Sequence, residues 1–192
     1  GYPSFPSMAA AMILKIPMII QEQNCFLGKS NRFFAKSANL IALSYKETDN
    51  IDIGFKSKLL FTGDIVRSEI RSLPEKNNFD TKQFYIFVFG GSQGAKIFSS
   101  LIPDTLDKLK QLNPQIKISV TQQASQEEQK YLVKYYANIL NIKYELAEFF
   151  YNMPEIYNKT QLVIARSGAS TIAELTNIGL PAIFIPYPHA SE

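Results

Sequence analysis

The sequence is poor in the residues that build disulfides and metal sites. It holds one cysteine, Cys25, and one histidine, His189, among 192 residues. A single cysteine excludes an intrachain disulfide and a four-cysteine metal site, and it suits a reducing compartment. A lone histidine near a strand end is more often structural than catalytic. Zinc chemistry and a Ser-His-Asp triad therefore have no clear support in this sequence.

Long apolar runs and a strong charge of one sign are also absent. No apolar run reaches the roughly 18 residues that a transmembrane helix needs, so none is predicted. The net charge is +3, and residues 1–76 carry all of it, because residues 77–192 hold ten basic and ten acidic side chains. The basic half suits docking on anionic lipid, although ordinary scatter explains +3 equally well. This charge is too low for a nucleic-acid-binding module, so we expect no nucleic acid partner.

The chain is 46% hydrophobic, enough for one substantial core or two small ones. Short apolar runs alternate with helical patterns at the spacing of βαβ units. Strands are predicted at 18–20, 40–44, 58–61, 84–89, 116–120, 142–146, 162–165 and 181–185, and helices at 7–14, 30–38, 95–112, 126–140 and 170–178. In the helix at 95–112, apolar residues recur at helical spacing at Ile97, Leu101, Leu106 and Leu109. The fold class predicted is therefore parallel α/β in two halves.

A polar, proline-containing stretch at residues 72–83 is the best linker in the chain. It separates a first domain at 1–71 from a second domain at 84–192. The chain begins and ends in segments that read as loops, so we expect it to be a fragment in which both domains are incomplete.

Two glycine-containing turns follow predicted strands and open helices. The first is Gly90-Gly91-Ser92-Gln93-Gly94, and the second runs from Arg166 through Gly168 and Ser170 to Glu174. Glycine lets the backbone approach a ligand closely, and a helix N-terminus favours phosphate. The first segment is either a phosphate loop or a simple turn. Glu174 either accepts hydrogen bonds from ribose hydroxyls or is stabilised by the helix dipole.

Other segments carry candidate contacts with a ligand. Phe149 and Phe150, at a strand end, either hold a flat base or pack in the core. The polar residues around Asn24 face another domain or line a solvated loop. Arg67 either reaches a diphosphate or is a surface arginine.

Taken together, these segments resemble the MurG family of cell-wall N-acetylglucosaminyltransferases, which have the GT-B fold. The resemblance rests on six stretches in order: Gly1–Ser4, Glu22-Gln23-Asn24 with Asn31-Arg32, Gly63–Arg67, Gly90–Ala95, Arg166–Glu174, and Gly179–Pro181 with Pro186–His189. It implies two Rossmann-like domains and inverting transfer of N-acetylglucosamine from UDP-N-acetylglucosamine to a lipid-linked muramyl-pentapeptide. It also implies that no metal or cofactor takes part, and that the enzyme works at the cytoplasmic face of the bacterial inner membrane.

The resemblance further implies which residues hold the donor. The donor contacts would be Asn24, Arg67, Ser92, Phe150, Ala169, Ser170, Thr171 and Glu174. Supporting residues would be Gly90, Gly91, Gln93, Gly94, Phe149 and Gly168. Arg67 and Ser92 would lie near the diphosphate, Phe150 would meet uracil through its backbone, and Glu174 would bind ribose.

The sequence also departs from the family pattern. Gln21 stands where the family usually has histidine, and Asp64-Ile65 replaces Asn-Pro. The family's glycine-rich loop with its proposed catalytic histidine has no counterpart in the sequence, so we expect the isolated chain not to catalyse transfer. Two alternatives stay open: another GT-B enzyme that uses a different UDP-sugar, and a non-catalytic remnant that at most binds a UDP-sugar.

Overall fold

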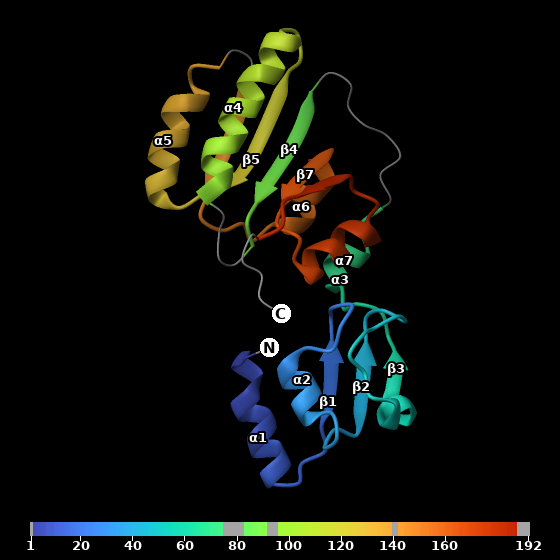
Figure 1. The fold of residues 1–192 in the computed structure, drawn as a ribbon. Coiled ribbons are helices and arrows are strands. Elements are labelled where there is room, and N and C mark those ends of the chain that lie inside the picture. Colours follow the sequence, from blue (N-terminus) through green and yellow to red (C-terminus); the bar gives the residue numbers. More distant parts are fainter. Residues whose placement is uncertain (1, 75–82, 92–95, 140–141, 188–192) are drawn as a thin grey trace. The chain divides into compact units, whose positions relative to one another are not determined.

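The computed structural model describes residues 2–74, 83–91, 96–139 and 142–187. These residues form two compact units, which divide after Ile65, each with its own sheet (Figure 1). Ser92–Ala95, most of the expected linker and His189 lie outside the described residues. Within the described residues, no helix has both the length and the apolar character to cross a membrane.

The first unit is a three-stranded parallel sheet in the order β1-β2-β3. Its strands are β1 (Ile19–Glu22), β2 (Leu40–Leu43) and β3 (Leu59–Phe61). Its helices are α1 (Phe5–Ile13) and α2 (Lys29–Phe34), with the short 3-10 helices η1 (Tyr2–Ser4) and η2 (Ile53–Lys58). Phe34, Ile41 and Leu27 lie in its core, whereas α1 has no buried residue.

The second unit is a five-stranded parallel sheet in the order β6-β5-β4-β7-β8. Its strands are β4 (Phe84–Phe89), β5 (Ile118–Gln123), β6 (Ile142–Ala147), β7 (Leu162–Ala165) and β8 (Ala182–Phe184). Its helices are α3 (Ser68–Arg71), α4 (Lys96–Leu112), α5 (Gln126–Tyr136), α6 (Met153–Lys159) and α7 (Ala169–Asn177). The predicted parallel α/β class is therefore confirmed.

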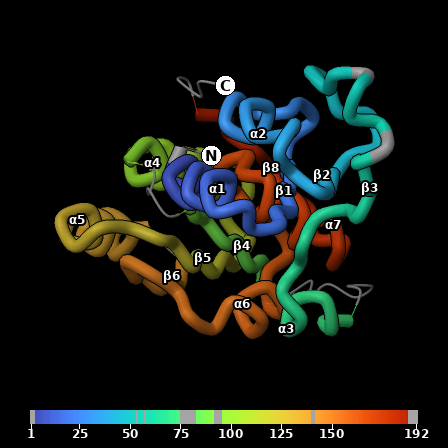
Figure 2. Tube along the Cα trace, turned by 90° about the horizontal axis from the view of Figure 1, so that it is seen from below, coloured from blue at the N-terminus to red at the C-terminus, as the bar shows by residue number. Residues whose placement is uncertain are grey.

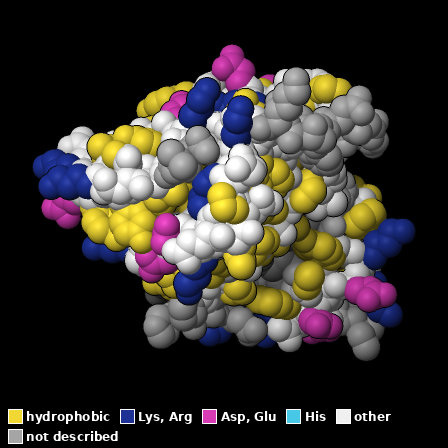
Figure 3. Space-filling view, turned by 90° about the horizontal axis from the view of Figure 1, so that it is seen from above, with side chains coloured by type: hydrophobic (Ala, Val, Ile, Leu, Met, Phe, Trp, Pro, Cys, Tyr) yellow, Lys and Arg dark blue, Asp and Glu magenta, His cyan; other side chains and the backbone are white. Residues whose placement is uncertain are grey.

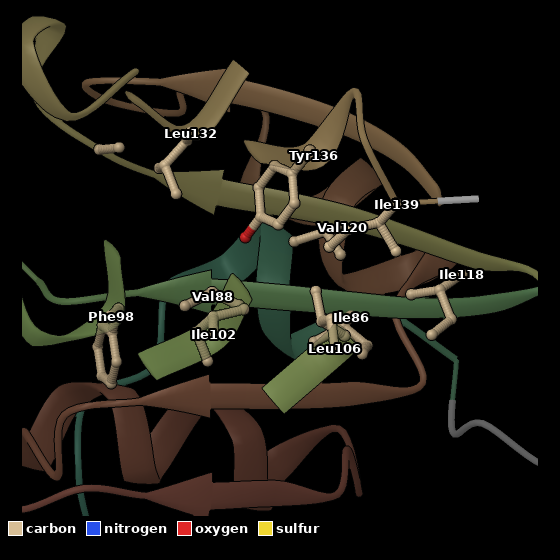
Figure 4. Packing of buried hydrophobic residues seen from close by; sticks show 11 residues of the cluster. Ile86, Val88, Phe98, Ile102, Leu106, Ile118, Val120, Leu132, Tyr136 and Ile139 are labelled. Carbon is tan, nitrogen blue, oxygen red and sulfur yellow. The ribbon is translucent and has the colours of Figure 1, made fainter. Parts of the chain in front are cut away.

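Each face of this sheet has its own core, because side chains alternate along a strand. Ile86 and Val88 of β4 pack with α4 and α5, and Figure 4 shows them beside Ile102 and Leu106. Phe87 points the other way, into a cluster with residues of α3, α6 and α7. Figure 2 shows α3 and α6 side by side on that face.

Two details of this unit differ from the sequence pattern. The buried face of α4 is Phe98, Ile102 and Leu106, while Ile97 and Leu101 are exposed, so the spacing indicated the helix but not its whole inner face. The compact units divide after Ile65 instead of after residue 71. The reason is that Ile70 of α3 is fully buried in the core of the second unit, against which Leu73 also packs.

Helices α3 and α6 have no counterpart in the predicted elements, because each is too short to show a helical period. Helix α7 ends at Asn177, one residue before the end of the predicted helix at 170–178. Gly179 has φ of 63°, and Leu180 N–H donates to Leu175 O, which forms the left-handed C-terminal cap that favours glycine.

Candidate functional site

The carboxyl ends of β4 and β7 form the topological switch point of the second sheet. The chain leaves β4 toward β5 and β6, then returns to β7 on the other side of β4. Phe89 and Ala165 are register partners, so the loops that begin at Gly90 and Arg166 start side by side. Open α/β sheets bind ligands at this place. The two glycine-containing turns predicted from sequence are thus brought to one edge.

The loop after β4 has the backbone that its glycines suggest. Gly91 has φ of 76°, in the left-handed region where a side chain is strained. Gly90 N–H donates to Gln123 Oε1 at 3.2 Å. Ser92, Gln93 and Gly94, which the sequence places in the same loop, lie outside the described residues.

The loop after β7 leads into α7 without a side-chain cap. Gly168 is the N-cap residue and has extended geometry, φ −70° and ψ 140°. Ala169, Ser170 and Thr171 form the first turn, where amide groups lack partners within the helix. Ser170 is exposed, and Ala169 and Thr171 are half-buried. This is a geometry that suits an anionic group.

Glu174 lies one turn further along α7 and is buried, with 8% exposure. Its Oε1 accepts from Arg67 Nε at 2.8 Å, and its Oε2 accepts from Arg67 Nη2 at 3.1 Å. The Tyr157 hydroxyl donates to Oε2 at 3.0 Å. The dipole of α7 is therefore not the only partner of this carboxylate, and Arg67 is more than a surface arginine.

The cluster is electrostatically coupled. The hydrogen bond to Glu174 raises the pKa of Arg67. Burial, followed by the charge of Glu174, raises the pKa of Tyr157 far above its usual value, so its hydroxyl stays a neutral donor. The site thus holds a carboxylate, a guanidinium and a phenol in one hydrogen-bonded group.

Arg166 serves a different purpose from Arg67. Its Nη1 donates to Ile185 O at 3.1 Å and to Pro186 O at 2.7 Å. Its guanidinium lies over the rings of Phe98 and Tyr187, 5.6 and 5.4 Å from their centroids. Arg166 therefore fastens the segment after β8 to the start of α4.

The aromatic segment after β6 divides between core and surface. Phe150 is buried and meets Phe87 edge-on at 5.6 Å between centroids. Phe149 and Tyr151 are exposed and contact each other at 4.8 Å between centroids. Core packing is thus the correct interpretation of the Phe150 side chain, while its backbone stays at the sheet edge.

Asn24 belongs to the first unit, where Glu22 organises the loop after β1. Glu22 is buried, and each of its oxygens accepts two hydrogen bonds. Oε1 accepts from the backbone and side chain of Asn24, and Oε2 accepts from Gly28 N–H and Asn31 Nδ2. Asn24 itself is exposed. The Glu-Gln-Asn segment is therefore a loop held by its own glutamate.

Sequence reasoning missed two polar contributors, Tyr157 and Gln123. Tyr157 lies on the short helix α6, and Gln123 ends β5, so neither belongs to a glycine-rich motif. A polar pair, Gln122-Gln123, at the end of an apolar strand was the available signal.

Across residues 2–74, 83–91, 96–139 and 142–187, no cluster of three or more His, Cys, Asp or Glu side chains has metal-binding geometry. The face shown in Figure 3 bears both basic and acidic side chains among hydrophobic ones.

The strand order and the loops at its carboxyl edge define a Rossmann-like α/β protein. A family model, the glycosyltransferase family 28 C-terminal domain, matches residues 85–192. The chain therefore belongs to glycosyltransferase family 28.

Curated relatives agree over the whole chain. It is 53% identical to the UDP-N-acetylglucosamine–N-acetylmuramyl-(pentapeptide) pyrophosphoryl-undecaprenol N-acetylglucosamine transferase of Rickettsia bellii and 51% identical to that of Rickettsia canadensis. Each alignment covers 100% of this chain and 54% of the relative. The chain thus spans about half the length of the curated relatives it matches.

Solved structures show the same architecture. The crystal structure of Acinetobacter baumannii MurG superposes with a TM-score of 0.73 at 26% identity, over 99% of this chain and 52% of that one. The UDP-GlcNAc 2-epimerase from Neisseria meningitidis, bound to UDP-GlcNAc, superposes with a TM-score of 0.60 at 15% identity over 94% of this chain and 56% of that one, a likeness of fold alone. The resemblance to the MurG family is confirmed.

Proposed function

We propose that this chain is the donor-binding half, with part of the acceptor half, of an inverting N-acetylglucosaminyltransferase. The reaction proposed is transfer from UDP-N-acetylglucosamine to undecaprenyl-pyrophosphoryl-muramyl-pentapeptide in peptidoglycan synthesis. The observation that carries the proposal is the 53% identity, across the whole chain, to a transferase named for this reaction. The second unit would hold the donor, and Asn24, which lies in the first unit, stays a proposed substrate contact.

The geometry of the second unit supports a nucleotide-diphosphate site. The first turn of α7 presents amide groups beside the Gly91 turn at one sheet edge, where a diphosphate would be stabilised. The Arg67 side chain is 48% exposed beside Glu174, so its guanidinium is accessible to a phosphate oxygen. Glu174 would accept from the ribose hydroxyls, and the Phe150 backbone would meet the uracil edge.

In the proposed reaction these residues bind the substrates and stabilise charge, and they form no covalent bond with the substrates. The acceptor hydroxyl oxygen forms a bond to the anomeric carbon as the bond from that carbon to the diphosphate oxygen breaks, and the hydroxyl proton passes to a general base. The negative charge that develops on UDP is stabilised by oriented amide groups and by the Arg67 guanidinium, which can take the place of a metal cation. We assign no catalytic base to the residues of this chain.

The first unit supports a peripheral membrane location. Helix α1 has no buried residue, and Ile13, Leu14 and Ile16 at its end are exposed beside Lys15. Apolar side chains next to a basic one suit the interface of an anionic bilayer. We place this surface against the cytoplasmic face of the inner membrane.

The test is a transfer assay with a protein that contains this chain at the length of its relatives. Radiolabelled UDP-N-acetylglucosamine and UDP-glucose are offered separately with the lipid-linked muramyl-pentapeptide acceptor. The proposal expects label in the lipid fraction from UDP-N-acetylglucosamine and its loss in Glu174→Ala. Equal transfer from UDP-glucose would assign the protein to another class of UDP-sugar transferase, and no transfer from either donor would overturn the proposal.

A further inference from the structure

The side-chain amide of Gln123 joins the two loops that lie on either side of β5. Its Oε1 accepts from Gly90 N–H at 3.2 Å, and its Nε2 donates to Glu148 O at 3.0 Å. The first partner begins the loop after β4, and the second begins the loop after β6. One side chain thus contacts the backbone of both loops.

The strand register explains why this position can bridge them. Gln123 is the last residue of β5 and pairs with Ala147, the last residue of β6, while Val88 pairs with Gln122 on the other side. Strands β4 and β6 therefore both end level with Gln123. The residues that come directly after them are Gly90 and Glu148. An amide carries a donor and an acceptor on one end, so glutamine satisfies both backbones without adding charge.

The loop after β6 is also fixed by contacts that do not involve Gln123. Phe150 is anchored in the core against Phe87, and Ala124 N–H donates to Ala147 O. Gln126 Nε2 reaches the Glu148 carboxylate at 3.1 Å, between exposed side chains. Among these contacts, the Gln123 amide is the one that ties the segment from Glu148 to Phe150 directly to the loop at Gly90.

We propose that Gln123 is a positioning residue that sets the base-reading backbone against the diphosphate loop and so determines discrimination between nucleobases. The inference rests on the proposed function, in which the Gly90 loop serves the diphosphate and the backbone of Phe150 serves uracil. Gln123 contacts neither part of the donor itself. It acts by holding two donor contacts at one spacing.

The test compares UDP with CDP, which carry the same diphosphate and ribose and differ only at the edge of the pyrimidine. The ratio of their dissociation constants, measured by calorimetric titration, cancels any change at the phosphates. Two variants are used: Gln123→Met removes both hydrogen bonds, and Gln123→Glu keeps an acceptor for Gly90 N–H but sets a carboxylate against Glu148 O. Gln126→Met is the matched control, because it removes a contact with the Glu148 side chain only.

The wild-type chain is expected to favour UDP. Both Gln123 variants are expected to lower that preference about five-fold, the size of effect that one hydrogen bond produces. Gln126→Met is expected to leave the ratio unchanged. Circular dichroism of each variant confirms the fold.

Three results would overturn the inference in distinguishable ways. If the wild type favours UDP and folded Gln123→Met has the same ratio of UDP and CDP dissociation constants, Gln123 has only a structural role. The proposed function would then still stand. A folded wild-type chain that binds UDP and CDP equally would overturn the inference alone, and one that binds neither would remove the proposed donor site as well.

Discussion

Arg67 and Glu174, 107 positions apart in the sequence, meet through two hydrogen bonds of 2.8 and 3.1 Å. Arg67 precedes the short helix α3, and Glu174 lies on α7, so the packing of these helices brings the charges together. The pair joins the residue proposed for the diphosphate to the residue proposed for the ribose. Ligands with and without phosphate can distinguish the two roles.

Replacing Arg67 should affect the phosphates more than the nucleoside. Arg67→Met is expected to weaken UDP binding about ten-fold, since a hydrogen bond to a charged group contributes roughly 1.5–3 kcal/mol. Uridine, which has no phosphate, should bind the variant and the wild type within about two-fold of each other, on the same energy scale. Competition titrations with both ligands make the comparison, and an equal loss for uridine would contradict the assignment.

Buried tyrosines should limit stability at alkaline pH. Burial raises the pKa of Tyr136, and burial with the charge of Glu174 raises the pKa of Tyr157. A raised folded pKa means that their contribution is complete below the unfolded value of about 10 and is lost as pH rises above it. Tyr157→Phe should therefore show a smaller drop in urea midpoint between pH 9 and 11 than the wild type. The exposed Tyr151→Phe serves as the control and should fall as the wild type does.

Glu128 should contribute at the acid end of the stability profile. Burial opposes its charged form, but hydrogen bonds from the Ser125 hydroxyl, Ser125 N–H and Ser99 outweigh it and lower its pKa. Its contribution is thus present above the unfolded pKa of about 4.3 and lost as pH falls below that value. Glu128→Gln should cost about 1 kcal/mol at pH 7, as the loss of a capping residue does, and less at pH 3. A urea-unfolding series that shows the same difference at both values would refute this account, with Glu127→Gln as the neighbouring control.

Glu22 should stabilise the first unit more than an exposed glutamate does. Its two oxygens accept four hydrogen bonds, two of them from Asn24. Glu22→Gln turns one acceptor into a donor that faces other donors, which should cost about 1–3 kcal/mol. Chemical unfolding followed alongside the exposed Glu47→Gln gives the comparison, and equal midpoints would contradict the role.

The pattern of this sequence predicted the sheet of the second unit well, because apolar runs such as Phe84–Phe89 are buried on both faces and glycines follow β4 and β7. It also predicted that the turns at Gly90 and Gly168 follow strands and open helices. It did not predict that Arg67 would face Glu174, because that contact depends on how the short helix α3 packs in three dimensions. The roles of Gln123 and Tyr157 were not predicted for a related reason. Their partners are backbone atoms or side chains far along the chain, which no local spacing reveals.

The most direct test of the donor site is calorimetric titration of UDP-N-acetylglucosamine into the 192-residue chain and into Glu174→Ala. The account predicts saturable one-to-one binding by the wild type and binding at least ten-fold weaker in the variant, since the ribose would lose hydrogen bonds to a charged acceptor. Circular dichroism establishes that both proteins are folded. Binding of equal strength by wild type and variant, or none by a folded wild type, would contradict the placement of the donor at the carboxyl edge of the second sheet.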